Sequence, residues 1–460
     1  SFLQKYLLHP DLRNSTSSLV TFVKKFFYNL YLFKNHIRNY QYRYYAKSDL
    51  PAIIGYVPSK TRNMIAQSPG TIVISALGFG EILISVDLIK KIKSLYSCPI
   101  VILSRQPQVV RQMHQSRGSS VTALPYPFFA GRPMISHWLG KLRPSLILCI
   151  ESMVELRADM LELAKERYKT SVLLVNAHAF RPSTFILHVL EDTKGENKRR
   201  FRCLDMAGVV SDEAGKYLLG NGVSDGSIVM VNNLKFDVAE QIAQTEETAM
   251  LRRQLGISGD SRVLICGSVH LGEEIIILKA FQDLIGRPGM ENIRLIIAPR
   301  ELYDIGRMVA SIKSLGFSVT LRTACSSGPH DGSAVIIVDT LGELKTLYSI
   351  ADVVVVAGSM LSDLFGHNPI EPAILGKPVI VGPYTPSFKD VMDKFLDRDA
   401  IIKLQHTEDL AERIAFLFEH PEIRERMGSH AKTIVEECRG ATAKYLDMIG
   451  GLLPRSFMES

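Results

Sequence analysis

Two stretches in the last third of the chain combine glycines with polar side chains that could bind a ligand. One is the turn 339–343, Asp-Thr-Leu-Gly-Glu, and the other is Gly366-His367-Asn368, which Glu371 follows. Glycine lets a ligand approach the backbone, and the N–H groups at a helix N-terminus attract an anion. A carboxylate at position 371 could accept a hydrogen bond from a sugar hydroxyl. These residue types suit an anionic sugar ligand, although a capped helix after an ordinary loop would explain Gly-His-Asn alone.

Regular elements must hold both stretches at one edge of a sheet. Residues 335–338, 353–357 and 379–381 are short apolar runs bounded by turns, whereas 341–348 and 370–375 have apolar residues at helical spacing. Such alternation is typical of parallel strands buried on both faces by intervening helices. Ligands bind at the carboxyl ends of these strands. Both stretches follow strands, so we expect them to lie at the same edge.

The same alternation extends over most of the chain. A length of 460 residues favours two domains, each with its own core. We predict a first α/β domain at 51–240 and a second at 241–460. Further strands are expected at 71–75, 99–103, 146–150, 171–175, 209–211, 262–267 and 293–297.

A carboxylate preceded by glycine, Glu81, follows the first of these strands. It comes directly after Gly80 and precedes an apolar helix predicted over 82–92. The helix dipole favours an ionised carboxylate at this place, and such a group can take a proton from an acceptor hydroxyl. The alternative is an ordinary, favourable first-turn charge.

Three stretches together resemble the Kdo transferases, which move 3-deoxy-D-manno-octulosonic acid (Kdo) from its CMP ester to lipid A. The chain shares Gly-Ser-x-His-x-Gly-Glu-Glu at 267–274, Asp-Thr-x-Gly-Glu-Leu at 339–344 and Gly-His-Asn-Pro-x-Glu-Pro-Ala at 366–373. Two glycines of the family are replaced, by Ala357 and Phe365. The second replacement puts a bulky side chain where the family has bare backbone.

The resemblance is weaker in the first domain. Where the family has His-Ala-Ser-Val-Gly-Glu, the chain keeps Gly80 and Glu81, and of Glu-Thr-Glu-Leu-Trp-Pro-Asn it keeps Glu151. The family's Gly-Asn-Leu-Lys-Phe-Asp survives as 232–237, with Lys235 as its cation. The family's glutamate at the Glu81 position serves as the catalytic base.

The resemblance implies a GT-B fold, in which two doubly wound domains face a cleft and the last helix can cross back onto the first domain. It also implies an inverting glycosyltransferase. Glu81 would deprotonate a hydroxyl of a lipid A-type acceptor, and this oxygen would attack the anomeric carbon of a CMP-activated 2-keto sugar acid. Neither a metal nor a further cofactor is implied, because cationic side chains and helix ends can neutralise the leaving phosphate. Lys235 and Glu151 would lie near the cleft, and the donor would be held by Ser268, His270, Arg300, Gly342, Glu343, Gly366, His367, Asn368 and Glu371.

A second hypothesis is a retired transferase that serves as a structural or binding subunit of a larger, possibly organellar, assembly. The shortened first-domain motifs and Phe365 motivate it. A basic N-terminal arm suited to docking motivates it too.

Residues 1–50 form this arm. They contain eight Lys and Arg against two Asp, with apolar residues at 19, 22, 23, 26, 30 and 33. A basic amphipathic helix can lie on an anionic membrane or on a protein partner, and it can also pack on its own domain. The arm is poor in acids and carries Arg and Ser, like the remnant of an organelle import signal.

Charge and cysteine usage narrow the remaining possibilities. The net charge of +7 is concentrated in the arm, so we expect no nucleic-acid groove in the body. Six scattered cysteines without a CxxC pair indicate a reducing compartment and no structural zinc. The predicted location is the cytoplasmic face of a membrane, or an organelle such as the mitochondrion.

Overall fold

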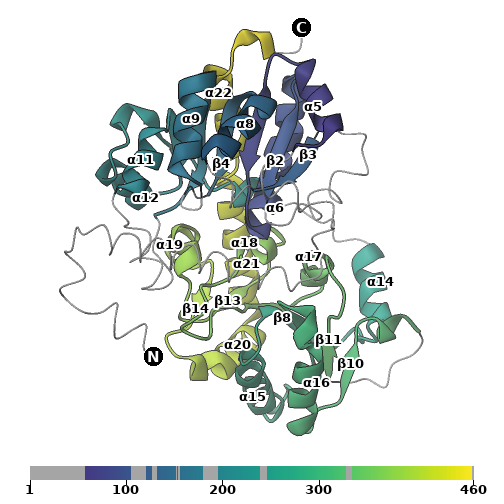
Figure 1. Ribbon diagram of the computed structural model, residues 1–460. Coiled ribbons are helices and arrows are strands. Elements are labelled where there is room, and N and C mark those ends of the chain that lie inside the picture. Colours follow the sequence, from purple (N-terminus) through teal and green to yellow (C-terminus); the bar gives the residue numbers. More distant parts are fainter. Residues whose placement is uncertain are drawn as a thin grey trace, which may run out of the picture. The chain divides into compact units, whose positions relative to one another are not determined.

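The computed structural model describes residues 57–104, 121–126, 132–151, 153, 156–179, 195–238, 246–327 and 334–457 (Figure 1). The predicted arm at 1–50 lies outside these residues. The described residues form two compact units, 57–234 with 440–457, and 235–439. The boundary therefore lies at 234/235 rather than at 240/241, and the last helix belongs to the first unit.

The first unit is built on a parallel sheet with the strand order β3-β2-β1-β4-β5-β6-β7. Its interior strand β1 is buried along its whole length, because helices cover both faces of the sheet. The strand expected at 209–211 lies at 206–209 instead, and β3 and β7 have no counterpart among the expected strands. β7 is a short, half-exposed edge strand, so it carries little apolar signal. The strands are β1 Thr71–Ser75, β2 Ile100–Ser104, β3 Val121–Pro125, β4 Pro144–Ile150, β5 Ser171–Ala177, β6 Met206–Val209 and β7 Ile228–Met230.

The helix at the end of the chain, α22, completes the first unit. The buried hydroxyl of Tyr445 accepts the N–H of Asn176 at 2.7 Å and donates to the carbonyl of Gly208 at 3.2 Å. A Cβ at Gly208 would come within 2.3 Å of the Tyr445 ring, so glycine is needed there. The helices of this unit are α5 Ser59–Ala66, α6 Phe79–Leu95, α8 Arg132–Leu142, α9 Ala158–Tyr168, α11 Glu196–Arg202, α12 Asp212–Gly220 and α22 Ala441–Leu452.

The second unit repeats this architecture with the strand order β10-β11-β9-β8-β12-β13-β14. The short strands β10 and β14 at its two edges have no counterpart among the expected strands. The strands are β8 Arg262–Val269, β9 Ile293–Pro299, β10 Val319–Leu321, β11 Val335–Ile337, β12 Val353–Val356, β13 Val379–Val381 and β14 Ile402–Lys403. The helices are α13 Lys235–Val238, α14 Glu246–Gln254, α15 Glu273–Ile285, α16 Ile305–Ser314, α17 Leu344–Tyr348, α18 Ile370–Ile374, α19 Lys389–Leu396, α20 Leu410–Glu419 and α21 Pro421–Glu437.

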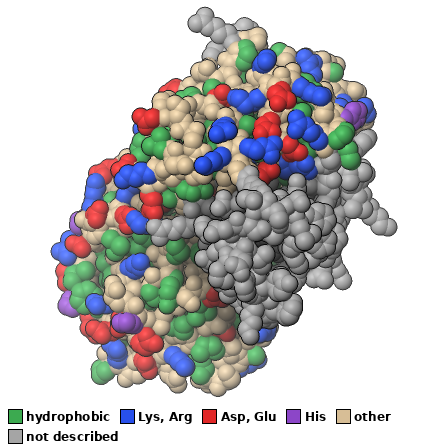
Figure 2. Space-filling model, turned by 60° about the vertical axis from the view of Figure 1, so that its left-hand side comes forward, with side chains coloured by type: hydrophobic (Ala, Val, Ile, Leu, Met, Phe, Trp, Pro, Cys, Tyr) green, Lys and Arg blue, Asp and Glu red, His purple; other side chains and the backbone are tan. Residues whose placement is uncertain are grey.

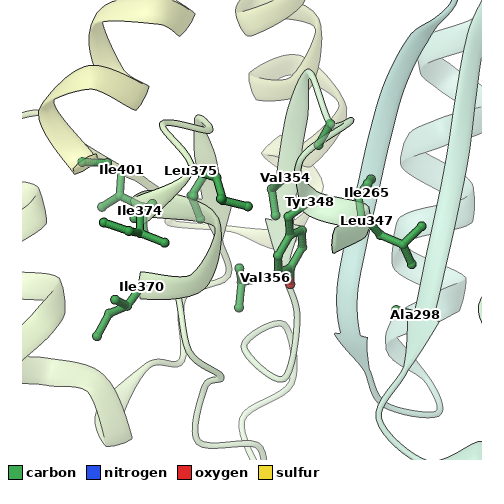
Figure 3. Close-up of a cluster of buried hydrophobic side chains, with 14 of the residues drawn as sticks. Ile265, Ala298, Leu347, Tyr348, Val354, Val356, Ile370, Ile374, Leu375 and Ile401 are labelled. Carbon is green, nitrogen blue, oxygen red and sulfur yellow. The ribbon is translucent and has the colours of Figure 1, made fainter. Parts of the chain in front are cut away.

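Successive side chains of β12 point to opposite faces of the sheet, and both faces are buried, so all four of its residues are apolar. Val354 and Val356 enter the core formed with α17 and α18 (Figure 3). Val353 and Val355 enter the core on the opposite face of the sheet. Tyr348 of α17 lies so close to β8 that a Cβ at Gly267 would come within 1.9 Å of its hydroxyl. Glycine at 267 therefore makes room for Tyr348 beside β8.

Cationic and acidic side chains are interspersed on the face shown in Figure 2. Each of the six cysteines is a buried free thiol. Among the described residues, no helix has the length and apolar character that a membrane span requires.

Candidate functional site

Two histidines meet at the carboxyl ends of β8 and β12. His270 follows β8, and His367 lies in the loop between β12 and α18. Their Nε2 atoms are 2.8 Å apart, and their ring planes differ by only 6°. This distance requires one N–H and one lone pair, so a single proton lies between the two Nε2 atoms.

Burial keeps His367 uncharged. Burial first, then the charges of Arg300 and His270, lower the pKa of His367 from 6.5 to about 3. The ring lies directly against Gly358, whose φ is +71° and where a Cβ would come within 2.2 Å of the His367 Cδ2. His367 is therefore a neutral hydrogen-bonding group at ordinary pH, and glycine makes room for it.

A carboxylate, Glu371, stands near the histidines at the start of α18. The Nδ2 of Asn368 donates to its Oε1 at 3.2 Å, and the Oδ1 of Asn368 accepts the N–H of Ile370 at 3.1 Å. Burial raises the pKa of Glu371, while the hydrogen bond from Asn368 and the charges of Lys345 and Arg300 lower it. Asn368 thus orients a carboxylate acceptor at the edge of the sheet.

An exposed cation, Arg300, completes this group. The backbone N–H of Arg300 donates to the carbonyl of Val269 at 2.8 Å. The charge of its exposed side chain acts on both His367 and Glu371. Ser268 lies at the same strand end, with φ +59° where the pairing of β8 with β9 shifts register. We call His270, Arg300, His367, Asn368 and Glu371 the strand-end cluster.

Glu273, which sequence reasoning did not select as a site residue, binds the backbone of the loops that carry this cluster. Its carboxylate is 0% exposed and accepts four backbone N–H groups at 2.8–3.0 Å. The donors are the N–H groups of His270, Gly358, Ser359 and Met360. In the sequence Glu273 looks like an ordinary first-turn acid, because the three donors after β12 are far away along the chain.

The turn 339–343 makes its contacts with a different partner. Glu343 lies 3.2 Å from the Nε of the buried Arg322 and accepts the hydroxyl of Thr340 at 2.5 Å. Gly342 has φ +84° in this turn. Gly366 has φ +87°, and its N–H donates to the carbonyl of Gly358 at 2.7 Å. The structure thus gives Glu343 an ion pair within the protein, whereas Gly366 belongs to the loop that carries His367.

In the first unit, Glu81 caps its own helix. Its Oε2 accepts the N–H of Leu77 at 2.6 Å and that of Gly78 at 3.3 Å, just before α6. Its negative charge also raises the pKa of the buried Cys149 at the end of the neighbouring strand, after burial itself. Glu81 therefore lies at the carboxyl edge of the sheet with one oxygen committed to the backbone.

A second polar group of this unit surrounds the buried Asn176. The Nδ2 of Asn176 donates to Glu151 Oε1 at 3.1 Å and to Asn233 Oδ1 at 3.2 Å, and it lies 3.3 Å from His178 Nε2. The Nε2 of His178 lies 3.3 Å from Glu151 Oε1. Glu151 and Asn176 both have positive φ, 59° and 60°. The sequence singled out Glu151, and the structure adds Asn176 and His178 beside it.

Lys235 begins the second unit in α13. Its Nζ lies 5.1 Å from the centre of the Phe388 ring, within the range of a cation–π contact. The place near a cleft that the resemblance implies for Lys235 stays a prediction, and one of its contacts is with this aromatic ring of its own unit.

Comparisons with known proteins match both units. Residues 49–238 match the family model "3-Deoxy-D-manno-octulosonic-acid transferase (kdotransferase)", and residues 332–434 match "Glycosyl transferases group 1". A 3-deoxy-D-manno-octulosonic acid transferase of Haemophilus influenzae is 25% identical over 86% of this chain and 90% of its own length. A probable mitochondrial transferase of the same name from Arabidopsis thaliana is 26% identical over 65% of this chain and 63% of its own length. The crystal structure of Anabaena Alr3699/HepE in complex with UDP and glucose has a similar fold, with a TM-score of 0.58, 13% identity and coverage of 83% of this chain and 98% of that one.

Two parallel α/β units and these matches define a glycosyltransferase of the GT-B class. The first unit matches the Kdo transferase family model, and a relative named as a Kdo transferase is similar along most of the chain. Among glycosyltransferases, the chain is thus similar to the Kdo transferases.

Proposed function

We propose that this protein transfers a 2-keto sugar acid from a CMP donor to a hydroxyl of a lipid A-type acceptor. The observation that carries the proposal is the strand-end cluster, because its groups match the parts of such a donor. Arg300 can pair with a phosphate or a carboxylate, and Glu371 can accept a ribose hydroxyl. The neutral His367 offers a hydrogen bond without adding a buried charge.

Glu81 is the proposed base. It would accept the proton of the acceptor hydroxyl, and the resulting oxygen would attack the anomeric carbon as the bond to CMP breaks. Attack from the side opposite to the leaving group inverts the anomeric configuration. Arg300 and nearby N–H groups would neutralise the charge that develops on the leaving phosphate.

Calorimetry with CMP and a turnover assay with CMP-Kdo and a lipid A precursor test the proposal. We expect heat of binding with CMP, a weaker response with UMP, and release of CMP during turnover. An absence of binding at millimolar CMP would contradict both the donor assignment and the catalytic role.

A structural subunit without turnover is the second candidate. The observation that favours it is Phe365, which is 41% exposed in a position where the resemblance leads us to expect glycine. Binding of CMP without turnover of CMP-Kdo, combined with co-purification of a stable partner, would support this candidate.

Residues 1–50 are proposed to dock on an anionic membrane surface or on such a partner. Eight cations against two acids support this part of the proposal. The mitochondrial relative from Arabidopsis supports an organelle as the compartment, beside the cytoplasmic face of a membrane.

A further inference from the structure

The fully buried carboxylate of Glu273 lies next to the strand-end cluster. Glu273 is 0% exposed, and each of its two oxygens accepts two N–H groups. Burying an isolated carboxylate is costly, and four charge-assisted hydrogen bonds offset that cost. The arrangement therefore persists only while all four donors point at this one carboxylate.

The four donors belong to the two loops that carry the histidine pair. Glu273 Oε2 binds the N–H of His270 at 2.9 Å and that of Gly358 at 2.8 Å, so one oxygen joins the two loops directly. Its Oε1 binds the N–H groups of Ser359 and Met360, both at 3.0 Å. The carboxylate thus clamps the end of β8 to the end of β12.

Gly358 connects Glu273 to His367, because it contacts both. The His367 ring lies against Gly358, and the N–H of Gly366 donates to the Gly358 carbonyl at 2.7 Å. Shifting the backbone of Gly358 therefore shifts the ring, while His270 is held through its own N–H. Because the hydrogen bond between the two Nε2 atoms depends on both positions, it depends on Glu273.

We propose that Glu273 is a positioning residue for the donor site: its carboxylate holds His270 and His367 in register without touching the donor. This inference rests on the proposed function as far as the donor is concerned. The coupling between Glu273 and the histidine pair can be measured without any ligand.

The chain supplies a matched control in the next residue. Glu274 is also almost fully buried, at 2% exposed, and also begins α15. Its carboxylate accepts the N–H of Gly272 and the hydroxyl of Ser311, so it does not join the two loops. Glu273→Gln and Glu274→Gln remove the same charge from the same turn, and only the first should disturb the histidines.

The primary readout is an NMR spectrum of the imidazole nitrogens and their protons, recorded on the whole chain without ligand. We expect the parent protein and Glu274→Gln to show the hydrogen-bonded N–H shared by His270 and His367, and Glu273→Gln to lose it. The affinity for CMP should fall by about tenfold or more in Glu273→Gln and little in Glu274→Gln. Melting temperatures of both variants separate this effect from a general loss of stability.

Three results would overturn the inference: the shared N–H persisting in Glu273→Gln, both variants changing the histidine signals equally, or a lower melting temperature as the sole effect. If Glu273→Gln does not fold, Glu273→Asp replaces it, because it keeps the charge but is one methylene too short to reach both loops. An intact histidine signal in Glu273→Asp would equally refute the proposal. Absence of CMP binding by the parent would reject the proposed function but not the coupling between Glu273 and the histidine pair, since the histidine signals need no donor.

Discussion

Replacing Glu81 by glutamine should reduce turnover far more than stability. Glutamine has nearly the same shape, and its oxygen can keep the 2.6 Å hydrogen bond from the N–H of Leu77. The helix loses a favourable charge at its N-terminus, which costs about 0.3–1 kcal/mol. An amide cannot take a proton from a hydroxyl, so we expect kcat to fall by about a hundredfold or more, equivalent to about 2.7 kcal/mol.

The measurements are steady-state kinetics with CMP-Kdo, calorimetry with CMP, and urea denaturation. The affinity for CMP should stay nearly unchanged, because the strand-end cluster lies in the other unit. Asp87→Asn is the matched control on the same helix, where Asp87 forms a partly exposed ion pair with Lys91 at 3.0 Å. Turnover of Glu81→Gln at the parent rate, or an equal loss in Asp87→Asn, would exclude Glu81 as the base.

Three further predictions concern the donor site, its pH dependence and the arm. Glu371→Ala should weaken CMP binding by roughly 1–3 kcal/mol through the loss of a hydroxyl contact, and unchanged calorimetry would contradict that contact. Because the pKa of His367 is lowered from 6.5 to about 3, the unfolded chain binds a proton between these pH values that the folded chain does not. His367 should therefore reduce stability as pH falls below 6.5, by up to about 1.4 kcal/mol per pH unit. Urea denaturation at descending pH should show a shallower loss in His367→Asn than in the parent, and identical slopes would refute this reading. Deleting residues 1–50 should leave the melting temperature nearly unchanged while abolishing sedimentation with anionic vesicles or co-purification with a partner; a large drop in melting temperature would show that the arm packs on its own domain.

Much of the fold could be predicted from the sequence because strands buried on both faces are unbroken apolar runs. The runs at β8, β9, β12 and β13 identify themselves locally, and the glycines and polar residues after them mark the carboxyl edge where ligands bind. Edge strands such as β7, β10 and β14 are short and partly exposed, so the same signal is weak there.

The residues of the candidate site could be selected in part from the sequence, but their geometry could not. His367, Asn368 and Glu371 could be selected from their types and spacing, and His270 from the family resemblance. Their mutual geometry could not be selected, because the 2.8 Å contact joins residues 97 positions apart in the chain.

By itself, the sequence determined the alternation of strands and helices, the loops that carry chemistry and the family resemblance. These depend on residue type and on neighbours within a few positions. Only the tertiary structure decided that Glu343 pairs with Arg322 and that Glu273 joins two loops. Each of these is a contact between distant segments, and it forms only when the packed sheet brings the ends of neighbouring strands together.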